Sequence, residues 1–257
     1  MVIKVLNENT SKRALRCEHG LSLYIETGAH RILFDTGQSD IFAENARKMG
    51  IDLSKIEMCI ISHGHYDHGG GVPCFLEIND TAPVYIHQNA SGSFYNESGK
   101  FIGLSKELFA HARIKQCSAI TELVPNITLI SSTCLQKKMA VDNFGLSMKI
   151  GDKLIPDDFK HEQYLLICEN NQSFLFSGCS HNGIINIEKH FHPDYYIGGF
   201  HLSKLPADER LNAYADALNQ YPTQYYTCHC TGEENFRYLQ QRMPHLHYLS
   251  TGETLHL

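Results

Sequence analysis

The stretch Ser62-His63-Gly64-His65-Tyr66-Asp67-His68 directly follows the apolar run 58–61 and is itself followed by three glycines. It brings three imidazoles and a carboxylate together within six residues, and such groups are costly to remove from water without a partner. A divalent metal ion is a suitable partner, because neutral imidazole nitrogen and carboxylate oxygen are preferred ligands of zinc and similar ions. A polar loop that binds nothing does not account for this density of ligand types. The stretch therefore predicts a metal site at the end of an apolar strand.

The spacing inside this stretch indicates two ions rather than one. His63 and His65 are two residues apart, so in an extended loop both side chains point to the same side and can chelate one ion. Asp67 and His68 come after the chain turns and can reach a second ion. The glycines at 69–71 let the backbone turn tightly beside the ions.

The rest of the chain alternates short apolar strands with turns and helices. Its patterns predict hairpins over 21–35 and 164–176, strands over 58–61, 84–87, 195–197, 224–227 and 247–249, and helices over about 41–49, 183–190, 211–218 and 236–243. The repeated order of hairpin, strand, polar tip and helix predicts two similar halves that bury one core, with sheets inside and helices outside. We expect a single domain of the α/β class over residues 1–257. The segment at about 88–126 is long for a plain connection and is either a lid or a surface insertion.

The composition restricts the class of protein further. The 257 residues are 42% hydrophobic and 19% charged, which is an ordinary globular balance. The net charge of −6 argues against a nucleic-acid partner, because such a partner requires a basic surface. No secretory signal is visible, no apolar run is long enough to span a bilayer, and the nine cysteines include no Cys-x-x-Cys pair. These features predict a cytoplasmic protein with reduced thiols and no membrane partner.

Six motifs together resemble those of one protein family. They are Glu18-His19-Gly20-Leu21-Ser22, Phe34-Asp35-Thr36-Gly37-Gln38-Ser39, the metal-binding stretch above, Gly178-Cys179-Ser180-His181-Asn182-Gly183, Gly198-Gly199-Phe200-His201-Leu202 and His229-Cys230-Thr231-Gly232. The His-x-His-x-Asp-His stretch is similar to the signature of the metallo-β-lactamase-fold superfamily. The whole set resembles its branch of dihydropterin-ribofuranosyl-aminobenzene-phosphate-synthase-like metal-dependent hydrolases. This resemblance covers nearly the whole chain and implies a four-layer αββα sandwich with the metal site at one edge.

The resemblance also implies a set of metal ligands. Members of the superfamily add a third histidine before a strand pair, an acidic or thiol ligand after it, and a last histidine late in the chain. His161 and Cys179 fit the first two positions, because two strands of the predicted hairpin return the chain close to its start. A surface position is the alternative for His161. The implied ligands are then His63, His65 and His161 for the first ion, and Asp67, His68 and His229 for the second.

Cys179 is the main departure from the family pattern, because most members carry a bridging aspartate at this position. A thiolate can bind zinc, but His181, two residues further on, can supply the ligand instead, and the sequence leaves both possibilities open. Cys228 and Cys230 flank His229 and are expected to pack around it or to support it.

Two further residues complete the candidate site. His201 follows the strand 195–197 and is, together with Asp67, a candidate catalytic residue. Its imidazole can act as a general acid or contact a substrate phosphate; the alternative is a histidine whose nitrogens are bound to the backbone. Asp35 is expected to accept a hydrogen bond from a ligand imidazole rather than to bind metal directly.

The predicted function is that of a dinuclear metal-dependent hydrolase, which acts on a small anionic ester, phosphodiester or lactone through a metal-bound hydroxide. Two divalent ions are expected, with zinc as the first choice and manganese or iron as alternatives. The expected partner is a small anionic substrate that can carry a phosphate. The resemblance implies one alternative, a transferase that uses a pterin diphosphate and releases diphosphate. Another hypothesis is a metal-binding sensor or interaction module with weak turnover.

Overall fold

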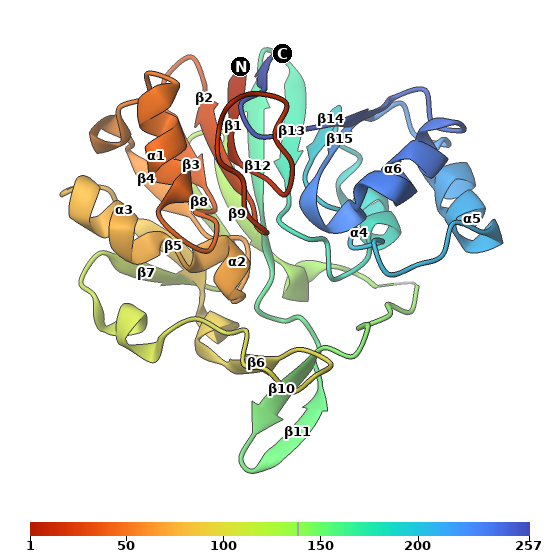
Figure 1. Ribbon diagram of the computed structural model, residues 1–257, viewed down its shortest axis with the longest axis horizontal. Helices are drawn as coiled ribbons and strands as arrows, with labels where there is room; N and C mark the ends of the chain where they lie inside the picture. The colour runs from red at the N-terminus through yellow and green to blue at the C-terminus, as the bar shows by residue number, and fades with distance from the viewer. Residues whose placement is uncertain (138) are drawn as a thin grey trace.

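The computed structural model describes residues 1–137 and 139–257, whose strands form two seven-stranded sheets and one smaller sheet (Figure 1). The first sheet contains, in spatial order, β17 (Thr254–His256), β1 (Val2–Asn7), β2 (Ser22–Glu26), β3 (Arg31–Phe34), β4 (Met58–Ile60), β5 (Val84–His87) and β7 (Ile114–Cys117). The second contains β16 (Leu246–Tyr248), β15 (Gln224–Thr227), β14 (Tyr195–Ile197), β13 (Gln172–Phe176), β12 (Gln163–Glu169), β9 (Ile127–Ser131) and β8 (Ile120–Val124). The small sheet contains β11 (Lys153–Pro156), β10 (Ser147–Ile150) and β6 (Ser93–Tyr95).

The two large sheets repeat one pattern of strand pairing. In the first, β1, β2 and β3 are antiparallel neighbours, and β4, β5 and β7 continue from β3 in parallel. In the second, β9, β12 and β13 are antiparallel neighbours, and β14, β15 and β16 continue in parallel. The predicted similarity of the two halves is therefore confirmed in the topology. Loops after the parallel strands of each half leave their sheets at the carboxyl ends, where open α/β folds place their ligand sites.

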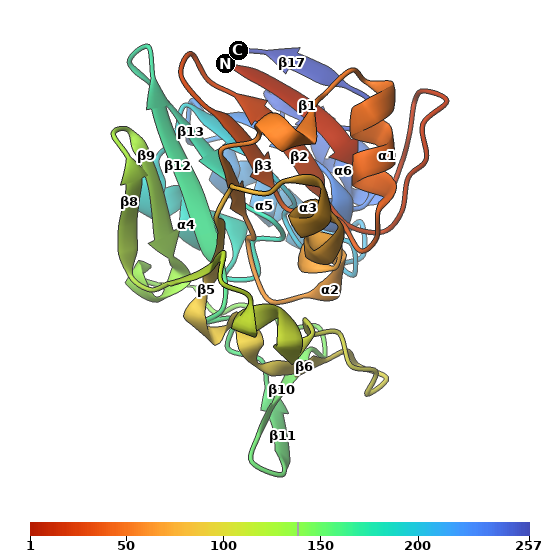
Figure 2. The same ribbon diagram turned by 90° about the vertical axis from the view of Figure 1, so that its left-hand side faces the viewer.

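Helices cover the outer faces of both sheets (Figures 1 and 2). On the first half they are α1 (Ile41–Lys48), α2 (Tyr66–Gly69) and α3 (Val72–Ile78), and on the second half α4 (Ile184–Phe191), α5 (Glu209–Leu218) and α6 (Glu233–Gln240). Strands β3 and β13 are apolar at consecutive positions because both of their faces are covered. Phe34 and Phe176 point into the core between the sheets, with ring centroids 5.9 Å apart, while Leu33 and Leu175 point to the helices. These layers confirm the predicted αββα sandwich.

The segment 88–126 has two different surroundings. Its second part supplies β7 and β8, which are edge strands of the two large sheets. Its first part supplies β6, which pairs with β10 in the small sheet that projects from one end of the molecule (Figure 2). Eight strands of the described residues were not among the predicted elements: β1, β6, β7, β8, β9, β10, β11 and β17. The role of this segment as a lid stays a prediction. Within the described residues, no helix is long and apolar enough to cross a membrane.

Glu188 of α4 is completely buried, and its carboxyl group forms no ion pair with the described residues. Thr223 Oγ1 donates a hydrogen bond to Glu188 Oε1 at 2.8 Å, while Oε2 has no hydrogen-bond partner among the described residues. Burial raises the pKa of Glu188 to about 7. Because the folded state holds this proton more tightly than the unfolded chain, the resulting stability is present below the unfolded pKa of roughly 4.3 and is lost as the pH rises through 7.

We therefore expect Glu188→Gln to be more stable than the parent protein at pH 8, by on the order of 2 kcal/mol, and to lose this advantage near pH 4.5. Urea unfolding of both proteins at the two pH values measures the difference. Glu209→Gln, at an exposed position of α5, serves as the control and should show no such pH-dependent difference. An advantage of Glu188→Gln that is equal at both pH values contradicts the prediction.

Candidate metal centre

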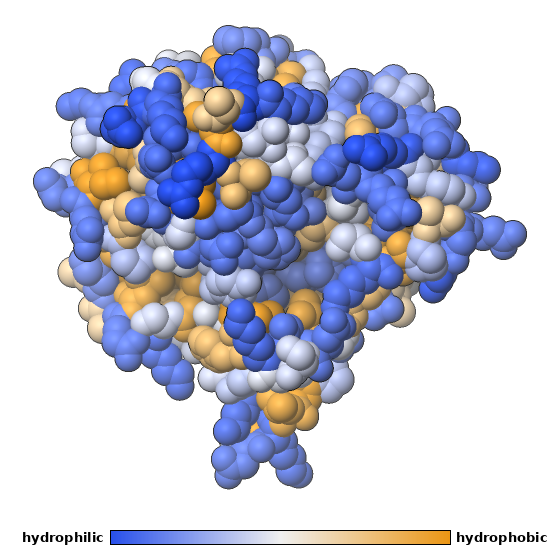
Figure 3. Space-filling view, viewed as in Figure 1, coloured by the Kyte–Doolittle hydropathy of each residue, from blue (hydrophilic) through white to orange (hydrophobic). Residues whose placement is uncertain are grey.

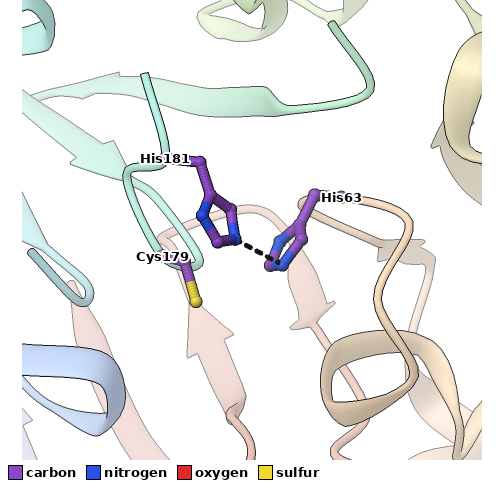
Figure 4. A group of neighbouring side chains, drawn as sticks. All are labelled: His63, Cys179 and His181. Atoms are coloured by element: carbon purple, nitrogen blue, oxygen red, sulfur yellow. Dashed lines mark hydrogen bonds between the residues drawn. The ribbon is translucent and has the colours of Figure 1, made fainter. Parts of the chain in front are cut away.

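The predicted ligands come together at one edge of the sandwich, although they are spread over the chain from residue 63 to residue 229. His63 and His65 follow β4, Cys179 and His181 follow β13, and His229 follows β15. Figure 4 shows His63 and His181 pointing toward one another from two loops of different halves, with Cys179 beside them. The repeated topology thus brings a loop of each half to the same place.

The first group of ligand atoms is formed by histidines. Nε2 of His63 lies 3.3 Å from Nε2 of His181, and the ring of His65 packs at 4.6 and 5.0 Å from these two rings. Nε2 of His65 and Nδ1 of His181 are buried without a hydrogen-bond partner among the described residues. Burial lowers the pKa of His63 and His181 well below the usual value, and that of His65 to about 4. These imidazoles are therefore neutral, which is the form that binds metal.

The second group contains a carboxylate and a thiol as well as histidines. Nε2 of His68 lies 3.2 Å from Nε2 of His229, and Sγ of Cys179 lies 3.2 Å from the same His68 nitrogen. Asp67 Oδ2 is 3.4 Å from His229 Nε2 and 3.8 Å from His68 Nε2. Cys179 belongs to both groups, since its sulfur also lies within 4.8 Å of the ligand atoms of His63 and His181. The structure therefore brings both Cys179 and His181 to the centre.

Asp35 and Ser62 fix the orientation of two of these imidazoles. Asp35 Oδ2 is 2.7 Å from His68 Nδ1, and Asp35 also accepts hydrogen bonds from the backbone nitrogen and the hydroxyl of Ser62. The same hydroxyl lies 2.8 Å from His63 Nδ1. Burial alone would lower the pKa of His68, but the carboxylates of Asp35 and Asp67 outweigh it and raise this pKa to about 9. In the protein without metal, His68 is therefore protonated at neutral pH.

His161 lies beside the first group in a different arrangement from the other histidines. Its Nδ1 accepts a hydrogen bond from the backbone nitrogen of Gly64 at 3.0 Å, and its Nε2 lies 3.1 Å from Asp157 Oδ2. Both ring nitrogens are thus engaged, and the ring is 5.9 Å from that of His63. Asp157 Oδ2 is also 3.9 Å from Nε2 of His65. The nitrogen that faces His63 in the structure therefore belongs to His181, not to His161.

Four residues of the site have a left-handed backbone although they are not glycines. They are Asp35, Ser180, His201 and His229, with φ between 47° and 63°. Such conformations are costly for residues with a side chain and are held in place by their surroundings, often at functional sites. All four lie within four residues of the end of a strand, where the loops turn toward the centre.

The two groups open into a cleft of about 300 Å³. Figure 3 shows the corresponding face hollowed near its centre, between the two halves, with hydrophilic residues around the hollow. His201 lines this cleft, and neither of its ring nitrogens has a hydrogen-bond partner among the described residues. Asn96 and Leu146, which flank β6 and β10, line it from the side of the small sheet. A larger pocket on another side of Tyr66 is lined by none of the candidate ligands.

Sequence reasoning assigned no role to two residues that contact the ligands. His19 is largely exposed, and its Nε2 lies 3.2 Å from Asp67 Oδ2. It stands in one of the six motifs, which is the signal that could have found it. Asp157 is fully buried between His65 and His161, and only its spacing of four residues from His161 hinted at this contact.

Comparison with known proteins gives consistent matches over most of the chain. Residues 15–196 match a family model described as the metallo-beta-lactamase superfamily. The chain is 28% identical over 248 residues to the uncharacterized protein MJ0448 of Methanocaldococcus jannaschii, covering 93% of this chain and 94% of the relative. It is 30% identical over 241 residues to the 7,8-dihydropterin-6-methyl-4-(beta-D-ribofuranosyl)-aminobenzene-5'-phosphate synthase of the same organism, covering 84% of this chain and 81% of the relative.

A solved structure matches the complete fold. The crystal structure of Tm1679, described as a metal-dependent hydrolase of the beta-lactamase superfamily, has a TM-score of 0.87 and 29% identity to this chain. The match covers 100% of this chain and 99% of that protein.

Proposed function

Because the chain belongs to the metallo-beta-lactamase superfamily, we propose that it is a metal-dependent hydrolase of a small anionic ester, phosphodiester or lactone. One observation carries this proposal. In two histidine pairs, one residue from each half, the Nε2 atoms lie 3.2 Å apart (His68 and His229) and 3.3 Å apart (His63 and His181). All four side chains are buried. A shared proton can account for two nitrogens that lie this close together. It does not account for Nε2 of His65 and Nδ1 of His181, which are buried without a hydrogen-bond partner among the described residues.

The donor set fits two divalent ions. We assign the first to His63, His65 and His181, which offer only imidazole nitrogen, and the second to Asp67, His68 and His229. This assignment replaces His161 of the sequence-based set by His181, because Nε2 of His181 faces His63 at 3.3 Å whereas the ring of His161 is 5.9 Å from that of His63. His161 instead groups with His65 and Asp157, whose ligand atoms lie within 4.8 Å of its own. Cys179 Sγ lies within 4.8 Å of ligand atoms in both groups, and we propose it as a ligand of one of the two ions. Imidazole and carboxylate donors with one thiol suit zinc, and they also accept manganese or iron.

Two such ions, held by these residues, would lower the pKa of a bound water molecule and stabilise the negative charge that develops on the substrate. The side chains of the protein supply orientation around them. Asp35 holds His68, and Ser62 holds His63, so that each presents Nε2 to the centre. His201 lines the cleft, and its imidazole is the candidate for donating a proton to a leaving group or binding a substrate oxygen. Both of its ring nitrogens are shielded from solvent, so this role requires the ring to turn toward the cleft.

A transferase is the second candidate, and it is favoured by the 30% identity to a synthase of the dihydropterin type. The two candidates differ in the fate of water. The purified protein, loaded with zinc or manganese, is incubated in 18O-labelled water with an aryl ester, an aryl phosphodiester and a lactone. Incorporation of the label into a product supports hydrolysis. A parallel incubation contains a dihydropterin diphosphate and a ribofuranosyl-aminobenzene phosphate as its acceptor. Diphosphate release that depends on this acceptor and leaves no label in the products supports the transferase, and absence of both reactions contradicts an enzymatic role.

We expect Cys179→Ser to lower the metal content of the protein more than Cys59→Ser does. Both thiols are buried, but Cys179 faces the candidate ligands whereas Cys59 lies inside β4 against the helices. Serine oxygen is a poorer zinc ligand than a thiolate, so only the first replacement weakens the centre directly. Elemental analysis of the folded fraction measures the metal per chain. Equal metal content in the two variants assigns the ligand role to His181 alone.

A further inference from the structure

A sulfur-rich group lies at the end of the centre that faces His201. The sulfurs of Cys179 and Cys230 and a ring nitrogen of His201 all lie within 4.8 Å of one another. Cys230 Sγ is 3.4 Å from the carbonyl oxygen of Cys179 and accepts a hydrogen bond from the backbone nitrogen of His201 at 3.2 Å. The three residues come from the loops after β13, β14 and β15, which are neighbouring strands. Neither His63 nor His68 takes part in this group.

The local backbone is shaped to hold these three side chains together. At Gly199, a Cβ atom would lie 2.4 Å from Cys230 Sγ, so only glycine leaves room for this sulfur. His201 has a left-handed backbone, with a φ of 53°. Both of its ring nitrogens are shielded from solvent and lack a hydrogen-bond partner among the described residues. Two thiols beside a partnerless imidazole form a donor set rather than a packed core.

Cys228, which follows the same strand as Cys230, has a thiol that packs in the core and serves for comparison. It lies two residues from Cys230, is fully buried, and belongs to the apolar cluster between the two sheets. It does not line the cleft, whereas Cys179 and Cys230 both do. The sequence expectation that both thiols around His229 pack or support it therefore fits Cys228 better than Cys230.

We propose that Cys179, His201 and Cys230 form an additional ligand set, which binds a thiophilic divalent ion such as zinc or cadmium. On binding, the ion displaces the thiol protons to solvent, and the two thiolate sulfurs and one imidazole nitrogen coordinate it. Soft sulfur ligands favour such ions over manganese or magnesium. A thiolate can bridge two ions, so Cys179 is able to serve this set and the neighbouring histidines together. The inference rests on the proposed function only through this shared thiol.

Cadmium titration of the metal-free full-length protein tests the inference, because the sulfur-to-cadmium charge-transfer absorption reports thiolate ligands independently of activity. We expect Cys230→Ser to lose one equivalent of bound cadmium and roughly half of the absorption, since one of two thiolates is gone. His201→Ala should lose the same equivalent. The matched control Cys228→Ser should behave like the parent protein. Equal uptake and absorption in Cys230→Ser and the parent overturns the inference.

Alkylation of the unmodified protein gives a second test if a variant fails to fold. Cadmium should protect Cys230 from iodoacetamide, as measured by peptide mass spectrometry, and reactivity of Cys230 that cadmium leaves unchanged overturns the inference. The two proposals fail in different ways. A protein that binds the additional ion but turns over no substrate contradicts the proposed function alone. A protein that hydrolyses substrate while Cys230→Ser retains every equivalent contradicts only the additional ligand set.

Discussion

Replacing Asp67 by alanine is expected to remove at least one equivalent of metal and to reduce turnover by more than about 100-fold. This loss is larger than the one expected for a residue that only orients a metal ligand. The reason is the position of its carboxylate. Asp67 Oδ2 lies within 3.8 Å of nitrogens of His19, His68 and His229. Burial alone would raise the pKa of Asp67, but these histidines outweigh it and hold the pKa well below the usual value. The carboxylate is thus ionised and available as a ligand.

Asp67→Asn separates charge from shape in this experiment. Asparagine keeps the volume but removes the negative charge, so we expect it to lose metal nearly as fully as alanine. Asp152→Ala, at an exposed position in the turn between β10 and β11, is the matched control and should keep both metal and turnover. Metal is measured by elemental analysis and turnover with the substrate found in the panel. Full retention of both quantities in Asp67→Ala excludes this carboxylate from the centre.

The second large effect is expected at Asp35, and it concerns stability as well as metal. The Asp35 carboxylate is completely buried and bonds to His68 and to two atoms of Ser62. Removing one partner of such a pair leaves a buried charge without compensation, which costs about 3–5 kcal/mol. The loss of imidazole orientation should weaken metal binding by a further 10–100-fold, approximately.

Asp35→Asn is the informative variant, because asparagine tolerates the left-handed backbone at this position better than alanine does. It therefore tests the charge with little added backbone strain. Chemical denaturation of the metal-free protein gives the stability loss, and a competition titration with a zinc chelator gives the affinity. A variant with unchanged unfolding and unchanged zinc affinity contradicts the role assigned to Asp35.

The part of the candidate centre that is local in the chain could be predicted from the sequence. His63, His65, Asp67 and His68 lie within one loop, so their spacing alone indicates a common site. The spacing along the chain could not show whether His161 or His181 faces His63. Both flank the hairpin of β12 and β13 and return to the same edge, and only the packing decides which nitrogen faces His63. Asp157 reaches His65 through the same packing.

Most of the strands that were predicted carry continuous apolar runs, although β1 and β9 were missed despite being largely buried. The hairpins and the short parallel strands are buried on both faces, and the chain shows this as continuous apolar runs. Strands β10 and β11 lacked this signal, because they form a projecting hairpin whose Ile150 and Leu154 are exposed. Pairing with β6, more than fifty residues away in the chain, completes their small sheet.

The facing nitrogens have a consequence for how the molecule holds together. In each close pair, one imidazole belongs to the first half and the other to the second: His63 meets His181, and His68 meets His229. Neither half alone carries a complete coordination sphere, so an isolated half should have little affinity for the ions. Uptake of metal and docking of the two sheets are thus thermodynamically linked. Chelation should consequently loosen the seam between the halves before it disturbs the interior of either one.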